Sequence, residues 1–283
     1  MSGFLHRHPR LRLAGLLTPP MLWLGVAYLG ALAALFITSL WTVDDFTGQV
    51  RIEWNLDNLK DVVTVPVYRA VTLRTLGVAA LVTLIDALLA FPIALFMAKV
   101  ASVRWQRILV IAVLTPLWAS YLVKAYAWRA MFSSTGPIDW ALAPFGLSGP
   151  GYGLPATVIT LAYLWLPYMI LPLYAGLERI PDSLLEASAD LGAGPWLTIR
   201  RVVLPALFPA LVAGSIFTFS LTMGDYIAVK IVGGTTQMLG NVVYDTFLTA
   251  NNKPLAAAVS MIPVVVMLVY LALVRRTGAL ENV

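Results

Sequence analysis

The chain has 283 residues, of which 60% are hydrophobic and 12% are charged, and its formal net charge is +5 at pH 7. Soluble domains carry about 25% charged residues, so this composition excludes an ordinary water-soluble protein. The absence of Cys excludes disulfides and thiolate metal sites. We predict an all-α integral membrane protein, because every backbone amide in a membrane span must be bonded within its own segment.

Six apolar segments are long enough to cross ~30 Å of hydrocarbon as helices. The first follows the basic segment MSGFLHRHPRLRLAG, which resembles a signal peptide but has no convincing cleavage site, so we expect an uncleaved span. His6 and His8 in that segment have no acidic or Cys companions, and we predict no metal site there. The predicted spans are Pro20–Leu40, Val71–Ala98, Ile108–Met131, Leu154–Gly176, Ala206–Gly224 and Leu255–Val274.

The segments between the spans organise the chain. Residues 1–70 hold the first span and an external segment, which is too short to fold separately, and residues 71–274 form the transmembrane core. The stretch SSTGPIDWALAPFGLSGPGYG predicts a structured turn with a short helix. The Gly-rich stretch GGTTQMLGN lies between Asp225 and Pro254. We expect it to fold back into the protein, since irregular backbone at membrane depth is tolerated where it lines a cavity.

Ionisable residues inside spans cost about 2.5 to 3.5 kcal/mol each and face a cavity or a partner. Asp86 lies near the middle of the second span, and Asp225 lies at the outer end of the fifth. Two alternatives remain: Asp86 pairs between helices, and the aromatic residues form an interfacial belt with helix packing. The candidate solute-pathway residues are Asp86, Trp118, Tyr121, Tyr126, Asp225, Tyr226, Tyr244 and Asp245.

A polar island, residues 177–205, separates the fourth and fifth spans. Pro181 ends the preceding helix, and Ser183 followed by Glu186 predicts a capping box that starts a short helix. Glu186 can act only as a cap of this helix, or it can also take part in binding a partner, and these two roles can coexist.

The second half of the island predicts a sharp turn and another helix. Gly192 and Gly194 break the first helix, and Pro195 suits the first position of the second. The residues whose spacing forms a motif are Glu186, Ala187, Ser188, Gly192, Val202, Leu204 and Pro205.

This spacing resembles the docking loop of permease subunits in bacterial ABC importers, written as Glu-Ala-Ala, three residues, Gly, nine residues, Ile, any residue, Leu-Pro. Ser188 stands for the second Ala and Val202 for Ile. The resemblance implies the type I importer permease fold and a loop that sits in a cleft of an ATPase subunit. The small side chains Ala187 and Ser188 would permit close approach there.

Further stretches resemble the spermidine/putrescine permease branch of this family. For a polyammonium solute, carboxylates would supply charge attraction and aromatic faces cation–π contacts. Lys230 opposes this reading unless it is paired with Asp225 or Asp245 or faces away, so another amine, an amino-acid derivative or an organic anion stays open. The stretches are LRTLGVAALVTLIDALLAFPIALFMAKV, TPLWASYLVKAYAWRAMF and MLGNVVYDTFLTANNKPLAAAVS.

The distribution of basic residues predicts the orientation. Eleven of the 19 Lys and Arg residues lie on one side, together with both termini and the docking loop, which predicts that this side is cytoplasmic. We expect a multi-pass protein of the bacterial cytoplasmic (inner) membrane. Attraction of the basic residues to anionic lipid explains the positive net charge, so we expect no nucleic-acid partner.

The sequence has no phosphate-binding loop, so the chain is not expected to hydrolyse ATP itself. The resemblance implies the partners: two ATPase subunits that bind ATP and Mg²⁺, a second and different permease subunit, and an external solute-binding protein. A secondary transporter is the alternative class, but the halves show no inverted repeat. An integral membrane enzyme would need clustered acid, base or metal ligands, and none is apparent.

Overall fold

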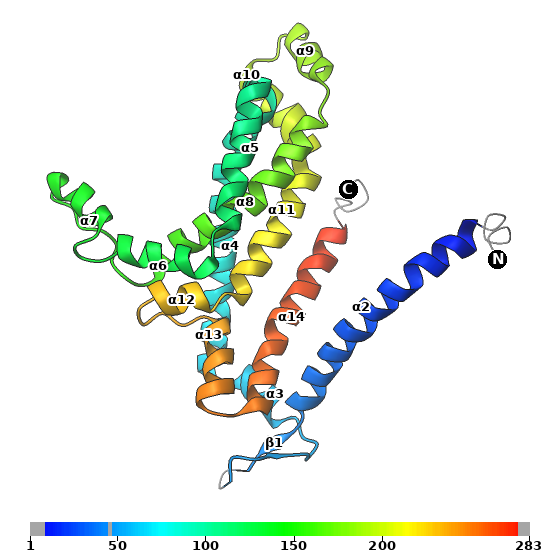
Figure 1. Ribbon diagram of the computed structural model, residues 1–283, viewed down its shortest axis with the longest axis vertical. Helices are drawn as coiled ribbons and strands as arrows, with labels where there is room; N and C mark the ends of the chain where they lie inside the picture. The colour runs from blue at the N-terminus through cyan, green and yellow to red at the C-terminus, as the bar shows by residue number, and fades with distance from the viewer. Residues whose placement is uncertain (1–8, 45–46, 277–283) are drawn as a thin grey trace. The chain divides into compact units, whose positions relative to one another are not determined.

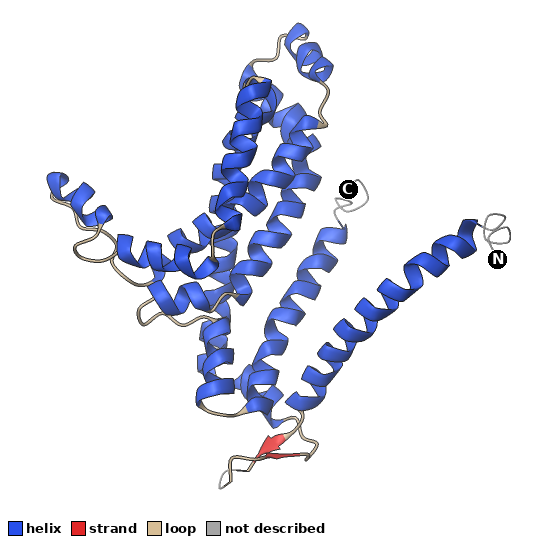
Figure 2. Ribbon diagram, viewed as in Figure 1, coloured by secondary structure: helices blue, strands red, loops and turns tan. Residues whose placement is uncertain are grey.

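The computed structural model describes residues 9–44 and 47–276, so His6 and His8 lie outside the described residues. Nearly all the regular structure is helical, as predicted (Figure 2). Five helices are long and apolar enough to cross a membrane, and one bent pair of helices makes a sixth candidate. The contacts divide the chain into two compact units, Met1–Val65 with Asp245–Met261 and Pro66–Tyr244 with Ile262–Val283.

The first unit contains the first span and most of the predicted external segment. Its long helix α2 (Pro9–Ser39) leads into a short hairpin of β1 (Thr42–Val43) and β2 (Val50–Arg51), which pair antiparallel. Asn58 holds the following helix to the end of α2, because its amide donates to the carbonyls of Ser39 and Trp41 at 3.1 and 2.7 Å. The other elements of this unit are α3 (Asp57–Thr64), η4 (Asp245–Thr249) and the start of α14 (Lys253–Arg276).

The second unit is built on three mutually packed helices, α4 (Pro66–Leu95), α8 (Leu154–Glu178) and α11 (Leu204–Gly224) (Figure 1). Two apolar clusters fill the space between them, one around Val82 and Leu161 and the other around Met97 and Leu173. Its remaining elements are η1 (Phe96–Val100), α5 (Val103–Trp118), α6 (Tyr121–Met131), α7 (Pro137–Leu142), η2 (Ala143–Phe145), α9 (Asp182–Asp190), α10 (Pro195–Thr198), η3 (Ile199–Val203), α12 (Ile227–Val232), α13 (Leu239–Tyr244) and the rest of α14.

Glycine allows α8 and α11 to approach closely. A Cβ added at Gly176 would lie 2.7 Å from Ala210 Cβ, and one added at Gly214 would lie 2.6 Å from Met169 Sδ. Small residues at helix crossings in membranes allow the backbones to pack directly, which replaces the hydrophobic drive that lipid cannot supply.

The predicted third span, Ile108–Met131, is bent in the structure. Residues 103–131 form α5 and α6, which meet at an angle of 94°. The backbone of Ala119 and Ser120 is extended, so the helix is interrupted between α5 and α6. The ammonium of Lys124 donates to the carbonyl of Pro116 at 3.1 Å, which satisfies one of the backbone groups that the break frees.

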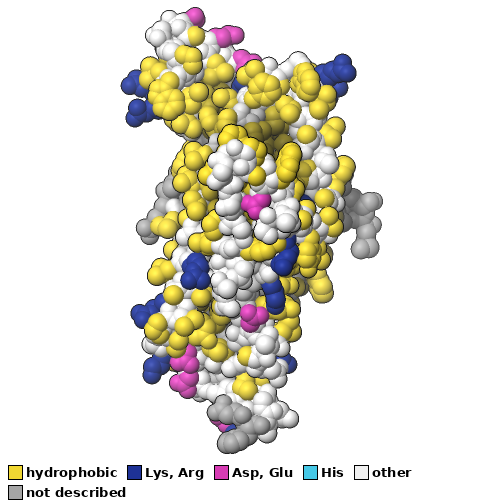
Figure 3. Space-filling view, turned by 90° about the vertical axis from the view of Figure 1, so that its left-hand side faces the viewer, with side chains coloured by type: hydrophobic (Ala, Val, Ile, Leu, Met, Phe, Trp, Pro, Cys, Tyr) yellow, Lys and Arg dark blue, Asp and Glu magenta, His cyan; other side chains and the backbone are white. Residues whose placement is uncertain are grey.

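The Gly-rich stretch after α11 packs into the second unit. Val229, Met238 and Leu239 are fully or almost fully buried, and Arg129 donates to the carbonyl of Ile231 at 2.6 Å. The short helix predicted in the preceding external segment is α7. Figure 3 shows hydrophobic side chains over most of one face, with charged groups scattered among them.

Replacing Gly176 with Val tests the contact between α8 and α11. The added methyl groups would meet Ala210 and Leu207, so we expect a loss of about 1 to 3 kcal/mol in stability, measured as a lower thermal unfolding temperature in detergent. Gly77→Ala on α4 is the control, because nothing lies within 4 Å of its added Cβ. Equal unfolding temperatures for Gly176→Val and the parent chain would contradict this packing.

Candidate functional site

The docking segment, residues 179–203, is a helix, a tight turn and a second helix between α8 and α11. Gly192 adopts a φ of +79°, a left-handed conformation that favours glycine. The amide of Ala193 donates to the carbonyl of Ser188 at 3.0 Å, and the hydroxyls of Ser188 and Thr198 lie 2.8 Å apart. These contacts fix α9 and α10 to each other, so the segment is suited to transmit force.

The helix at the start of the docking segment differs from the predicted capping box. Pro181 is the residue before α9, and no side chain caps the helix, so the expected exchange between Ser183 and Glu186 is absent. The carbonyl of Pro181 accepts from the amide of Leu184 at 3.1 Å, and Asp182 forms an ion pair with Lys99. The predicted turn at Gly192 and the second helix beginning at Pro195 are confirmed.

The motif residues lie on different faces of the segment. Glu186 and Ala187 are exposed on α9, whereas Ser188 is buried against α10. Leu191 and Trp196 are 88% and 71% exposed, and the motif did not single them out. The available signal was Trp196, a large aromatic side chain in a polar segment, because Trp is enriched among the residues that contribute most to protein interfaces.

The first residues of the docking segment, Arg179 to Pro181, border a cavity of about 490 Å³ between α8 and α11. Leu204 and Pro205, the last two motif residues, begin α11, and Pro205 lines this cavity with Pro181 and Arg179. The cavity is mostly apolar.

A second set of candidate residues meets at the other end of α11. The hydroxyl of Tyr121, from α6, donates to the carboxylate of Asp225, and the other oxygen of that carboxylate accepts from the amide of Ala228 at 2.9 Å. Asp225 is 7% exposed. The sequence predicted both Tyr121 and Asp225 for one pathway but did not predict this contact, which joins residues 104 apart in the chain.

A cavity of about 310 Å³ opens beside this pair. Trp165, from α8, stacks on Tyr121 with the ring centroids 6.0 Å apart, and Ser220 of α11 contributes a hydroxyl. A carboxylate between aromatic rings can bind an ammonium group by charge attraction and cation–π contact. Trp165 and Ser220 were missed because only folding brings α8 and α11 against α6. The lining residues are Tyr121, Trp165, Ser220, Leu221, Gly224, Asp225, Tyr226 and Ile227.

Tyr226 connects this cavity to Tyr244 and Lys230. The rings of Tyr226 and Tyr244 stack with centroids 4.9 Å apart, and the ammonium of Lys230 lies 4.1 Å from the centroid of Tyr244. A basic side chain of the protein therefore already occupies one aromatic face beside the candidate pathway.

The other candidate pathway residues do not line this cavity. Asp86 is fully buried within the second unit, and its carboxylate oxygens have no hydrogen-bond partner among residues 9–44 and 47–276. Trp118 and Tyr126 are 82% and 58% exposed. Asp245 belongs to the first unit.

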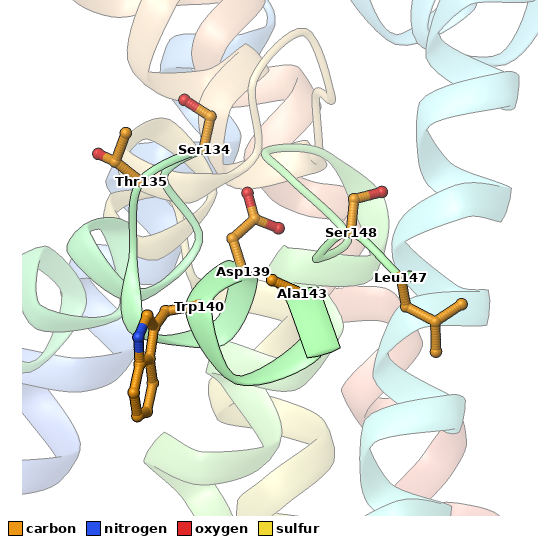
Figure 4. A pocket seen from close by; sticks show the side chains of 7 residues that line it. All are labelled: Ser134, Thr135, Asp139, Trp140, Ala143, Leu147 and Ser148. Atoms are coloured by element: carbon orange, nitrogen blue, oxygen red, sulfur yellow. The ribbon is translucent and has the colours of Figure 1, made fainter. Parts of the chain in front are cut away.

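A cavity of about 400 Å³ lies in the segment between α6 and α8. Its carboxylate, Asp139, accepts a hydrogen bond from the amide of Gly149, and Figure 4 shows the ring of Trp140 directed away from that carboxylate. None of the candidate residues lines this cavity. Within residues 9–44 and 47–276, no group of three His, Asp or Glu side chains could hold a metal ion.

Comparisons with known proteins extend these observations. The family described as binding-protein-dependent transport system inner membrane component matches residues 64–278. The chain is 43% identical to the inner membrane ABC transporter permease protein YdcU of Escherichia coli, covering 99% of this chain and 94% of that protein. It is 31% identical to the spermidine/putrescine permease PotB of Haemophilus influenzae, covering 94% and 90% of the two chains.

Solved structures support the fold. A chain of a bacterial alginate ABC transporter matches with a TM-score of 0.72 at 16% identity, covering 95% of this chain and 94% of that chain. A chain of the MetNI methionine ABC transporter matches with a TM-score of 0.58 at 19% identity, covering 74% and 93%. This chain therefore belongs to the family of binding-protein-dependent inner membrane transport components, the permeases of type I ABC importers.

Proposed function

We propose that this permease imports polyamines such as spermidine and putrescine. Tyr121 and Asp225, with Trp165 beside them, carry the proposal: they place one buried carboxylate among aromatic rings at a cavity of about 310 Å³. An ammonium group is the complement of such a site. The 31% identity to spermidine/putrescine permeases supports the same solute class.

The docking segment would receive the motion of the ATPase subunits. Glu186 and Ala187 are exposed beside the apolar side chains of Leu191 and Trp196. A rigid helical pair of this kind would enter a cleft of the ATPase, which binds ATP and Mg²⁺. ATP binding would close the two ATPases and switch two paired permeases from inward-facing to outward-facing, while an external binding protein delivers the solute. Both termini and the docking segment would face the cytoplasm.

A different small solute is the second candidate. Lys230 lies over the ring of Tyr244, so this part of the pathway already contains a cation that would repel a polyamine and attract a carboxylate. An organic anion or an amino-acid derivative would then be the solute. Because the chain belongs to the importer permease family, we no longer propose the alternative class, a secondary transporter.

Solute class is tested by uptake into proteoliposomes that contain the complete importer and its external binding protein. We expect ATP-dependent uptake of labelled spermidine that unlabelled putrescine reduces and that organic anions leave unchanged. Uptake that only anions reduce would reject polyamines.

The turn of the docking segment offers a matched pair of glycines. Gly192→Val places a β-branched residue at a φ of +79°, which costs about 1 to 2 kcal/mol, or about five- to thirtyfold in an equilibrium. We expect at least a fivefold loss of ATPase retained on co-purification, with insertion intact. Gly194→Ala is the control, because its φ of −69° suits any residue. Equal retention in both variants would argue against docking here.

The carboxylate of Asp225 is tested by Asp225→Asn, which keeps the size of the side chain but removes its charge. Charged hydrogen bonds contribute about 1.5 to 3 kcal/mol, so we expect spermidine uptake at low concentration to fall about tenfold or more. Asp139→Asn is the control, since its carboxylate holds a loop beside a different cavity. Unchanged uptake by Asp225→Asn would place the pathway elsewhere.

A further inference from the structure

Lys99 bridges the place where α8 ends and the docking segment begins. Its ammonium donates to the carbonyl of Ile180 and to the carboxylate of Asp182, both at 2.7 Å. The Lys99 side chain is 14% exposed, whereas that of Asp182 is 77% exposed. A single side chain from the end of α4 thus holds residues on both sides of Pro181.

Pro181 is the bend between the two helices. It has an extended backbone, with a φ of −62° and a ψ of 139°, and α9 begins at the next residue. A change in direction of α9 relative to α8 would occur through this residue. Lys99 binds the residue before the bend and the residue after it, so α9 cannot turn freely while both contacts persist.

The backbone around Lys99 is also unusual. Lys99 lies in η1, a π-helical segment that continues α4, and such segments are frequent at functional sites. Met97 of the same segment is fully buried in the cluster that contains Leu177, Ile180 and Val203. The segment η1, which continues α4, therefore contacts the start of the docking segment by both apolar packing and a partly buried ammonium.

A neighbouring polar contact differs in one respect. Gln106 of α5 donates to Glu178 of α8 at 2.9 Å, but both partners lie on the helix side of Pro181. It holds α5 to α8 without crossing the bend. Lys99 differs because its two acceptors, Ile180 and Asp182, lie on opposite sides of Pro181.

The docking segment thus has two connections to the bundle. Its second half continues without interruption from α10 through η3 into α11. Its first half contacts the bundle through Leu185, which packs on the apolar cluster around Met97 and Leu173, and through Lys99, which connects it to η1 at the end of α4. Since α4 packs against α11, both connections lead into the same group of helices.

We infer that Lys99 is a positioning residue that couples movement of the docking segment to α4, so that a stroke of the ATPase moves α4 and α11 together. The inference rests on the proposed docking role of residues 179–203. Without the ammonium, α9 would remain joined to α11 through α10, but a smaller part of its movement would reach α4.

The test measures movement without relying on the solute. The chain has no Cys, so Ser220→Cys places a single thiol in the cavity beside Asp225. In the complete importer, with accessible Cys removed from the partner subunits, the labelling rate by a membrane-impermeant maleimide is measured with and without ATP and vanadate. ATP hydrolysis and the unfolding temperature are measured on the same samples.

We expect Lys99→Met to keep the ATPase bound and active while the nucleotide-dependent change in labelling falls about fivefold or more. Lys99→Arg should restore the change, because a guanidinium can reach both acceptors. Asp182→Asn, at an exposed position, should lose part of the nucleotide-dependent change in labelling. It replaces Lys99→Met as the test variant if Lys99→Met does not assemble with the partner subunits. Arg104→Gln is the control, since it removes one exposed positive charge from the nearby start of α5.

A full labelling change in Lys99→Met, or in Asp182→Asn where that variant replaces it, would overturn the inference. Loss in Lys99→Met that Lys99→Arg does not restore would also overturn it, because a general packing defect would then explain the loss. Failure of the parent chain to retain any ATPase is a different result, which removes the proposed docking role and the inference with it.

Discussion

The close contact between α8 and α11 is the interaction on which the rest of the second unit depends. Gly176 and Gly214 bring the two backbones together, and the docking segment joins the end of α8 to the start of α11. The separation of these helices therefore sets the distance that the segment must bridge. The same packing aligns α8 and α11 so that Trp165 and Ser220 reach one cavity at the opposite end of α11.

Basic side chains donate hydrogen bonds to backbone carbonyls at irregular places in this unit. Lys124 donates to the carbonyl of Pro116, Arg129 to that of Ile231, and Arg74 to that of Gln237 at 3.1, 2.6 and 3.3 Å. An unpaired backbone carbonyl away from water is costly, so each cation stabilises irregular backbone.

The sequence predicted part of the candidate site for reasons that the structure makes clear. The docking segment is local: a left-handed Gly192 and a Pro at the first position of α10 follow from neighbours in the chain. The capping box failed because α9 begins at Asp182, with Pro181 at its N-cap, so Ser183 lies inside the helix and cannot cap it. In the pathway, Tyr121 and Asp225 were predicted separately, but Trp165 carried no local signal that distinguished it from ordinary helix packing.

Composition and local residue preferences by themselves determined the helical membrane class, the approximate positions of the long apolar segments and the turn of the docking segment, because each depends on local hydrophobicity or backbone preference. Only the tertiary structure decided the 94° bend after α5, the contact between Tyr121 and Asp225, and the bridge from Lys99 across Pro181. Those features depend on which distant groups can satisfy a buried donor or acceptor, and helix packing alone brings those groups together.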